Sequence, residues 1–165
     1  MNNIIHDSLG AFHVIVAVLA LISGTIVLIM KKGSKRHQQI GYLYAFNMLL
    51  VNLTAFGIYH MWGRFGIFHV AAIIGLVTLL TGMLPIMLKK PRGGYIGLHF
   101  SFMYWSVMGL YAALVSETLT RIPETPFYGM LGISTFGMMM VAAWGFRRNQ
   151  PKWNRQFNRQ TKLVK

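Results

Sequence analysis

The chain contains no cysteine among its 165 residues. A disulfide framework, a thiolate metal site, an iron–sulfur cluster and a covalently attached c-type haem all require cysteine, so the sequence excludes each of them. Acidic residues are almost as scarce, because only Asp7, Glu117 and Glu124 are present. Any metal chemistry must therefore use histidine, methionine, tyrosine or one of these carboxylates.

Charged residues of both signs make up only 12% of the chain, whereas hydrophobic residues make up 55%. A soluble domain carries about a quarter charged residues. A helix needs about 20 apolar residues to cross the hydrocarbon core of a bilayer. Such runs occur at 8–30, 38–61, 66–88, 97–119 and 127–146. The sequence therefore predicts an all-α polytopic membrane protein with five transmembrane helices and no separate soluble domain.

One short pattern occurs twice, as Gly-Ala-Phe-His-Val at 10–14 and as Gly-Ile-Phe-His-Val at 66–70. Each copy is followed by an apolar run, a Lys-Lys turn and another histidine, His37 in the first case and His99 in the second. Such self-similarity indicates a duplicated supersecondary unit. We expect two helical hairpins, at about 10–61 and 66–119, to form a four-helix core. The fifth helix completes a single transmembrane domain over 1–146.

The net charge of +13 is unevenly distributed. Basic residues fill the first and third connections and the tail at 147–165, whereas only Arg64 and Arg121 join the acids on the other side. The positive-inside rule then predicts an outside N terminus and a cytoplasmic C terminus. We expect the basic residues to orient the protein and contact the lipid bilayer, and we expect no nucleic acid partner. The tail is either an interfacial helix or disordered.

The rise of a helix places the histidines at two depths, with His13 and His69 at an outer level and His37 and His99 at an inner level. In a four-helix bundle the first and third helices are diagonal, about 12–14 Å apart. Two imidazoles that reach inward across this gap suit a flat macrocycle held through its iron. Small residues follow His13 at helical spacing and would leave room for it, although close packing of membrane helices also selects them. They are Ala17, Ala20 and Gly24.

Glu117 follows His99 by 18 residues, which is five turns, so both side chains share one helix face. An ionisable group at membrane depth is a functional candidate. Glu117 is therefore interpreted as a proton relay, a third metal ligand or an orienting partner of an outer histidine. The structural alternative is an ion pair with Arg121, one turn further along. His60 lies near the membrane surface and is interpreted as interfacial unless it joins a metal site.

The pattern Lys-Lys-Gly-x-x-x-His-x-x-x-Gly-Tyr-x-Tyr from Lys31 to Tyr44 adds a further signature. A second one is His99 followed by Phe-Ser-Phe-Met-Tyr-Trp-Ser. Together with the two Gly-x-Phe-His copies, they resemble a bacterial family of predicted membrane proteins, domain of unknown function 2306, over about 10–121. This resemblance implies a multi-pass protein of the bacterial cell membrane and assigns no activity.

More distantly, the layout is similar to the two-haem transmembrane cytochromes b of the ascorbate-reducible and ferric-reductase type. That resemblance implies that His13 and His69 hold an outer haem b and that His37 and His99 hold an inner one. It also implies electron transfer across the membrane with a quinol or another redox partner. The chain departs from that family because its core begins at the first helix and because His37 is shallow.

Three functions stay open at this point. The first is an electron carrier with one or two b-type haems, which would make the protein a membrane oxidoreductase. The second is a zinc- or copper-binding protein or metalloenzyme with an outer site at His13, His69 and Glu117, joined by His60. The third is a non-catalytic accessory subunit or transporter whose histidines hydrogen-bond across helices. The oligomeric state is not fixed by the sequence.

Overall fold

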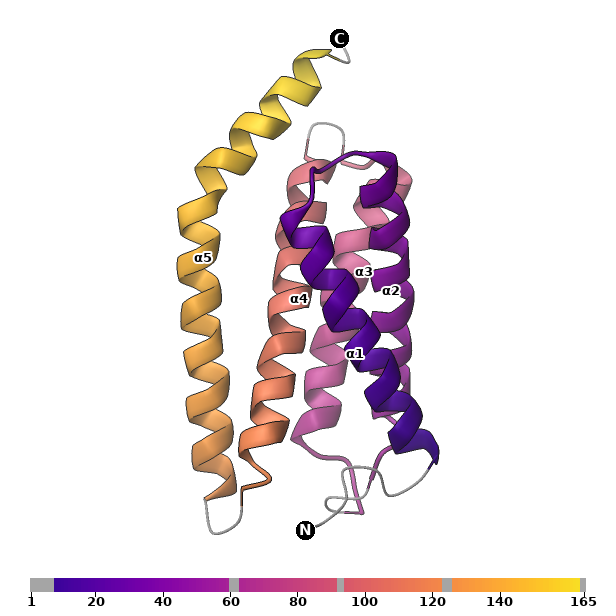
Figure 1. Ribbon diagram of the computed structural model, residues 1–165, viewed down its shortest axis with the longest axis vertical. Coiled ribbons are helices and arrows are strands. Elements are labelled where there is room, and N and C mark those ends of the chain that lie inside the picture. The colour runs from indigo at the N-terminus through magenta and orange to yellow at the C-terminus, as the bar shows by residue number, and fades with distance from the viewer. Residues whose placement is uncertain (1–7, 60–62, 92–93, 123–125, 164–165) are drawn as a thin grey trace. The chain divides into compact units, whose positions relative to one another are not determined.

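The computed structural model describes residues 8–59, 63–91, 94–122 and 126–163, and the side chains of the last segment as far as Trp153. These residues form five α-helices and no strand, as the sequence predicts (Figure 1). The helices are α1 (Ser8–Ile29), α2 (Lys35–Ala55), α3 (Ile67–Leu88), α4 (Tyr95–Leu119) and α5 (Phe127–Leu163).

Four of these helices, α1, α3, α4 and α5, are long and apolar enough to cross a membrane. The prediction of long apolar helices is confirmed for these four, and that they cross a membrane rests on their length and composition. The remaining helix, α2, is long enough but more polar, because it begins with Lys35 and Arg36 and buries Asn47 and Asn52. That α2 crosses the membrane stays a prediction, and so does the orientation of the termini, which depends on the number of crossings.

The bounds of α2 differ from the predicted 38–61 at both ends. The helix begins at Lys35 because the Ser34 hydroxyl accepts a hydrogen bond from the His37 backbone N–H at 3.1 Å, which caps the first turn. It ends at Ala55, after which the Gly57 N–H donates to the Thr54 carbonyl at 3.0 Å in a tighter turn. The apolar run continues past this turn, so hydrophobicity alone overestimates the helix.

The predicted fifth span at 127–146 does not stop where its apolar residues stop. α5 continues as one helix to Leu163, so the basic tail is helical as far as that residue. Figure 1 shows α5 leaning over in its C-terminal part. Pro151 lies inside the helix and has no N–H to donate, which is a usual cause of such a bend.

The chain divides into two compact units, Met1–Met83 and Leu84–Lys165. The first unit holds α1, α2 and most of α3, and the second holds the end of α3 with α4 and α5. Each unit is described by itself below. The boundary between them falls inside α3, whereas the sequence repeat divides the chain between 61 and 66. The duplicated hairpin and the single domain over 1–146 therefore stay predictions.

In the first unit, α2 lies against both α1 and α3. Leu9 of α1 fills the space beside Gly57, where an added Cβ would come within 2.8 Å of the leucine Cδ2. Asn52 of α2 fills the space beside Gly75 of α3, where an added Cβ would come within 2.5 Å of the amide oxygen. Gly57, in the turn after α2, and Gly75, within α3, are thus both covered by neighbouring side chains, and such close contacts at small residues are typical of membrane helices.

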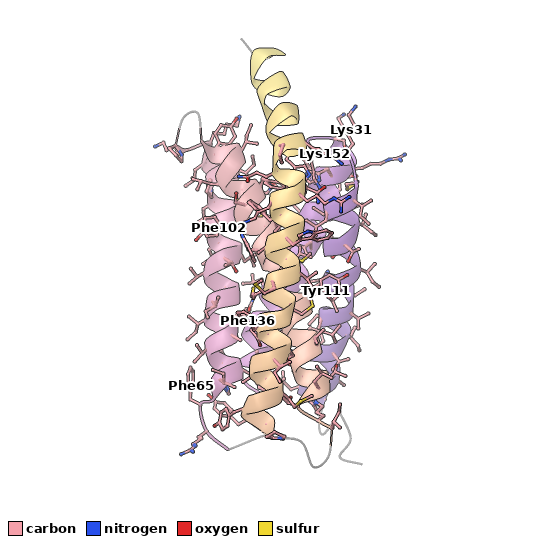
Figure 2. All side chains as sticks on the ribbon, turned by 90° about the vertical axis from the view of Figure 1, so that its left-hand side faces the viewer. Lys31, Phe65, Phe102, Tyr111, Phe136 and Lys152 are labelled. Carbon is pink, nitrogen blue, oxygen red and sulfur yellow. The ribbon has the colours of Figure 1, made fainter. Side chains whose placement is uncertain are left out.

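In the second unit, α4 and α5 form a hairpin with a polar contact near each end. At one end the Tyr104 hydroxyl donates to the Ala142 carbonyl at 2.8 Å. At the other end the Ser116 hydroxyl lies 3.0 Å from the hydroxyls of both Ser134 and Thr135. The other side of α5 carries exposed apolar side chains such as Phe136, as lipid contact requires (Figure 2).

Candidate histidine site

His13 lies in α1 and bonds across to α2. Its Nδ1 is 2.7 Å from the Thr54 hydroxyl oxygen. The single proton of that hydroxyl is directed to the Leu50 carbonyl, also at 2.7 Å, so the oxygen is left to accept from His13 Nδ1–H. We therefore assign the Nδ1–H tautomer to His13, which leaves a lone pair on Nε2.

His69 is the third residue of α3 and has the opposite arrangement. Its Nδ1 accepts a hydrogen bond from the Gly66 backbone N–H at 3.1 Å. Gly66 is the N-cap residue, since its carbonyl accepts from the Val70 N–H in the first turn. His69 thus reaches back to the start of its own helix, as the third residue of a capping box does. A neutral imidazole that accepts at Nδ1 carries its proton on Nε2.

The Nε2 atom of His69 is buried and has no hydrogen-bond partner among the residues that the structure describes. The whole side chain is only 5% exposed. Three aromatic rings surround it, and their centroids lie 4.7 Å (Tyr59), 4.9 Å (Phe65) and 6.4 Å (Phe56) from the imidazole centroid. Figure 2 shows Phe65 at the end of α3 where the helix begins. A polar atom in such apolar surroundings is costly unless something binds it.

The two histidines of the predicted outer level are thus brought to the same end of α2. The last turn of α2 contacts His13 through Thr54, and the segment that follows contacts His69 through Phe56 and Tyr59. The small residues that follow His13 are not an open face, since Ala20 is fully buried and Gly24 is buried as well. The alternative interpretation of that stripe, close helix packing, therefore accounts for it.

The two histidines of the predicted inner level belong to different units. His37 lies in the first turn of α2 and is half-buried, and its shallow position in the membrane stays a prediction. His99 is the fifth residue of α4 and is also half-buried. Because each unit is described by itself, the pairing of His37 with His99 stays a prediction.

Glu117 lies near the C-terminal end of α4 and is half-buried. Since α4 is continuous from Tyr95 to Leu119, Glu117 and His99 lie on one face of it, as predicted. Arg121 lies within electrostatic range of the carboxylate, which is the structural alternative considered above. Glu117 is in the second unit, so its roles as a proton relay or as a partner of His13 and His69 stay predictions.

A zinc or copper site needs three or more ligands. Among the residues that the structure describes, no three histidine, cysteine, aspartate or glutamate side chains gather in a way that could hold a metal ion. His60, the further ligand of that alternative, lies outside the described residues. No observation therefore favours the metal site over the haem site.

The residues around the two histidines are the part of the site that sequence reasoning missed. Thr54 gives no signal by type, because threonine is ordinary in a membrane helix. Tyr59 and Phe65 resemble the aromatic residues of an interfacial belt. Only their spacing, ten and four residues before His69, places them at the end of α2 and the start of α3.

Residues 10–147 of the chain match the model of a family described as predicted membrane protein, DUF2306. The match covers more than half of the chain and confirms the resemblance found in the histidine and glycine pattern. No curated protein and no solved structure matches the chain. The more distant resemblance to two-haem cytochromes b has no support from these comparisons.

Proposed function

The chain belongs to the predicted membrane protein family DUF2306, and from this premise we propose that it is an electron carrier of the membrane that binds haem b. His13 and His69 would hold one haem, and His37 and His99 a second one at the other level. Bound haem would supply one-electron exchange at its iron. Electrons would pass between a quinol or another donor on one side and an acceptor on the other.

The observation that carries the proposal is the buried Nε2 of His69, which has no partner within the described part of the chain. An orphaned polar atom in a protein interior costs about 1–3 kcal/mol, and the bilayer offers no water to relieve it. A ligand on Nε2 removes this cost. The rings of Phe56, Tyr59 and Phe65 around the imidazole give the apolar surface that a macrocycle requires.

His13 supports the proposal through its tautomer. A histidine that ligates a metal usually donates its other ring N–H to an oxygen, which fixes the ring and makes the ligating nitrogen more basic. The bond to Thr54 does this for Nδ1 and leaves the Nε2 lone pair for iron.

His69 fits iron only after one change. Ligation through Nε2 requires the proton on Nδ1, so the hydrogen bond that Nδ1 accepts from Gly66 must be given up. A neutral hydrogen bond contributes about 0.5–1.5 kcal/mol net. This cost is smaller than the gain from satisfying the buried Nε2 by a metal bond. Haem binding is therefore expected to loosen the cap at the start of α3.

The test is a reduced-minus-oxidised absorption spectrum of the purified full-length protein together with its haem content. His13→Ala and His69→Ala should each remove the same bis-histidine signal, whereas His99→Ala should remove a different one. Gln38→Ala changes an exposed neighbour of His37 and should leave both absorption signals unchanged. In His69→Gly, added imidazole should restore the lost signal, because it replaces a ligand rather than a packing contact.

A protein that holds no haem after expression with haem supplied would overturn the proposal. Stoichiometric zinc or copper in such a protein would instead support the metal-binding alternative. Loss of the signal in His69→Gly without rescue by imidazole, together with lost helicity, would assign His69 a structural role.

A further inference from the structure

α5 is longer than a membrane is thick. Its 37 residues span about 55 Å at 1.5 Å per residue, whereas the hydrocarbon core is about 30 Å. The part that can cross the membrane ends by Trp153. About a quarter of the helix, residues 154–163, therefore extends past this part, and it is basic and has no acidic residue.

Aromatic contacts fix which side of α5 faces α4 at this level. The ring of Trp153 lies 4.3 Å from Phe100 and 5.8 Å from Tyr104 of α4, measured between centroids. Phe146, two turns earlier on α5, stacks on the same Phe100 ring at 6.0 Å. The helix is thus held to α4 through one aromatic side as far as Trp153.

The opposite side of α5 carries exposed cations. Arg148 and Lys152 lie one turn apart and are both exposed. At 100° per residue, they stand about 140° and 100° around the helix from Trp153. The Arg148 guanidinium lies over the Trp144 ring at 5.2 Å, so it is held close to the end of the apolar part. Figure 2 shows Lys152 on the C-terminal part of α5.

The same helical register continues the row of charges. Positions 155, 159 and 162 are arginine, arginine and lysine, and the spacing of three and four residues keeps them within about 40° of position 148. No acidic residue follows Glu124 in the sequence. We call the row formed by positions 148, 152, 155, 159 and 162 the cationic face of α5.

We propose that the cationic face binds anionic phospholipid headgroups of the membrane that α5 crosses. The helix leaves the hydrocarbon directly into this row, so its first cations lie at headgroup depth. The bend at Pro151 lets the rest of the row turn toward the bilayer surface. A run of basic residues directly after a transmembrane helix is the arrangement that recognises anionic lipid. This inference does not depend on haem binding.

The experiment measures lipid selectivity by electron spin resonance, with spin-labelled phosphatidylglycerol or phosphatidylcholine in vesicles that contain the full-length protein. The wild type should select phosphatidylglycerol by about threefold or more at low salt, and the selectivity should fall as salt rises. The triple variant Arg148→Gln, Lys152→Gln, Arg155→Gln should bring the two lipids close to equal. The charge-conserving variant Arg148→Lys, Arg155→Lys should retain the selectivity.

The matched control removes the same number of charges elsewhere. Lys31→Gln, Lys35→Gln, Arg36→Gln changes three exposed residues of the first connection and should leave the selectivity nearly intact. An equal loss in both triple variants would show a general charge effect and overturn the proposal. A wild type without selectivity would overturn it as well. The proposal would also be overturned if the triple variant Arg148→Gln, Lys152→Gln, Arg155→Gln lost binding of an added oligonucleotide but kept the wild-type lipid selectivity.

Discussion

The two Gly-x-Phe-His copies place the same residues at different points of a helix. α1 begins at Ser8, before the first copy, so all of that copy is helical and His13 turns toward α2. α3 begins at Ile67, inside the second copy, so His69 falls in the first turn and reaches back to the helix start. A shift of a few residues in the start of the helix therefore changes what the histidine does.

The difference decides which nitrogen is left for other partners. His13 uses Nδ1 as a donor to Thr54 and keeps a lone pair on Nε2. His69 uses Nδ1 as an acceptor from Gly66 and keeps a buried N–H on Nε2. A repeated motif in the sequence is thus not a repeated hydrogen-bonding role, because the role depends on the start of the helix and on the neighbours.

The largest effect is expected where the helix of the second copy meets α2. Gly75→Ala would place a methyl group 2.5 Å from the Asn52 amide oxygen. Asn52 is buried, and its amide N–H donates to the Met48 carbonyl at 2.7 Å, so it has little freedom to move. We expect the free energy of unfolding to fall by about 2 kcal/mol, measured by reversible denaturation in mixed micelles.

Near the first copy the same change should cost less. Gly57→Ala makes its one close contact with the flexible end of Leu9, which can rotate away, and meets the Thr54 carbonyl oxygen at an ordinary 3.5 Å. Gly41→Ala, with no atom within 4 Å, is the control and should be neutral or slightly stabilising. An equal cost at Gly75 and Gly41 would show that α2 and α3 are not in close contact.

The next prediction concerns the two histidines, whose replacement by leucine should change the free energy of unfolding in opposite directions. His69→Leu removes an orphaned buried N–H and keeps an apolar side chain among the aromatic rings. We expect the free energy of unfolding of the haem-free protein to rise by about 1 kcal/mol, a net value that already includes the lost hydrogen bond from Gly66. His13→Leu removes a satisfied bond between helices and should cost about 1 kcal/mol. The same denaturation assay on haem-free protein measures both, and changes of the same sign would remove the distinction between the copies.

A smaller effect is the coupling between His13 and Thr54. In a double-mutant cycle with His13→Ala and Thr54→Val, we expect a coupling free energy of about 0.6–1 kcal/mol, the usual size for hydrogen bonds between membrane helices. A cycle that combines Thr54→Val with His69→Ala serves as the control and should give no coupling, since no bond joins these residues. A coupling that is larger in the control would contradict the assignment of Thr54 to His13.

The sequence predicts the helices well where their ends coincide with the ends of apolar runs. α1, α3 and the C-terminal end of α4 agree with the predicted bounds within one residue. α2 and α5 do not, because Ser34 and the turn at Gly57 set the ends of α2, and because basic residues continue the helix of α5. Caps and helix propensity act independently of hydropathy.

The candidate site is predictable only in part. The repeat identifies His13 and His69, and helical rise assigns them a common level. Neither the repeat nor the helical rise identifies Thr54 or the rings around His69, since these depend on how α2 turns between α1 and α3. The tautomers follow from those partners, so they too are beyond the reach of the sequence.

The smallest effect is expected at the basic turns that follow α1 and α3. Lys32 donates from Nζ to the Val27 and Leu28 carbonyls, each at 2.6 Å, and so closes the C-terminal end of α1. Lys89 and Lys90, at the corresponding place after α3, are exposed. Burial lowers the pKa of Lys32 to about 8 from its ordinary 10.5. The turn after α1 should therefore respond to pH through Lys32.

Between about pH 8 and pH 10.5 the unfolded chain holds a proton on Lys32 that the folded protein has released. Stability rises with pH wherever the unfolded state binds more protons, so this residue should make the protein more stable as pH rises through that window. Lys32→Gln should remove that rise, whereas Lys90→Gln should keep it. The check is the free energy of unfolding of all three proteins across the window. If the free energies of unfolding of wild type and Lys32→Gln change in parallel, the lowered pKa of Lys32 is contradicted.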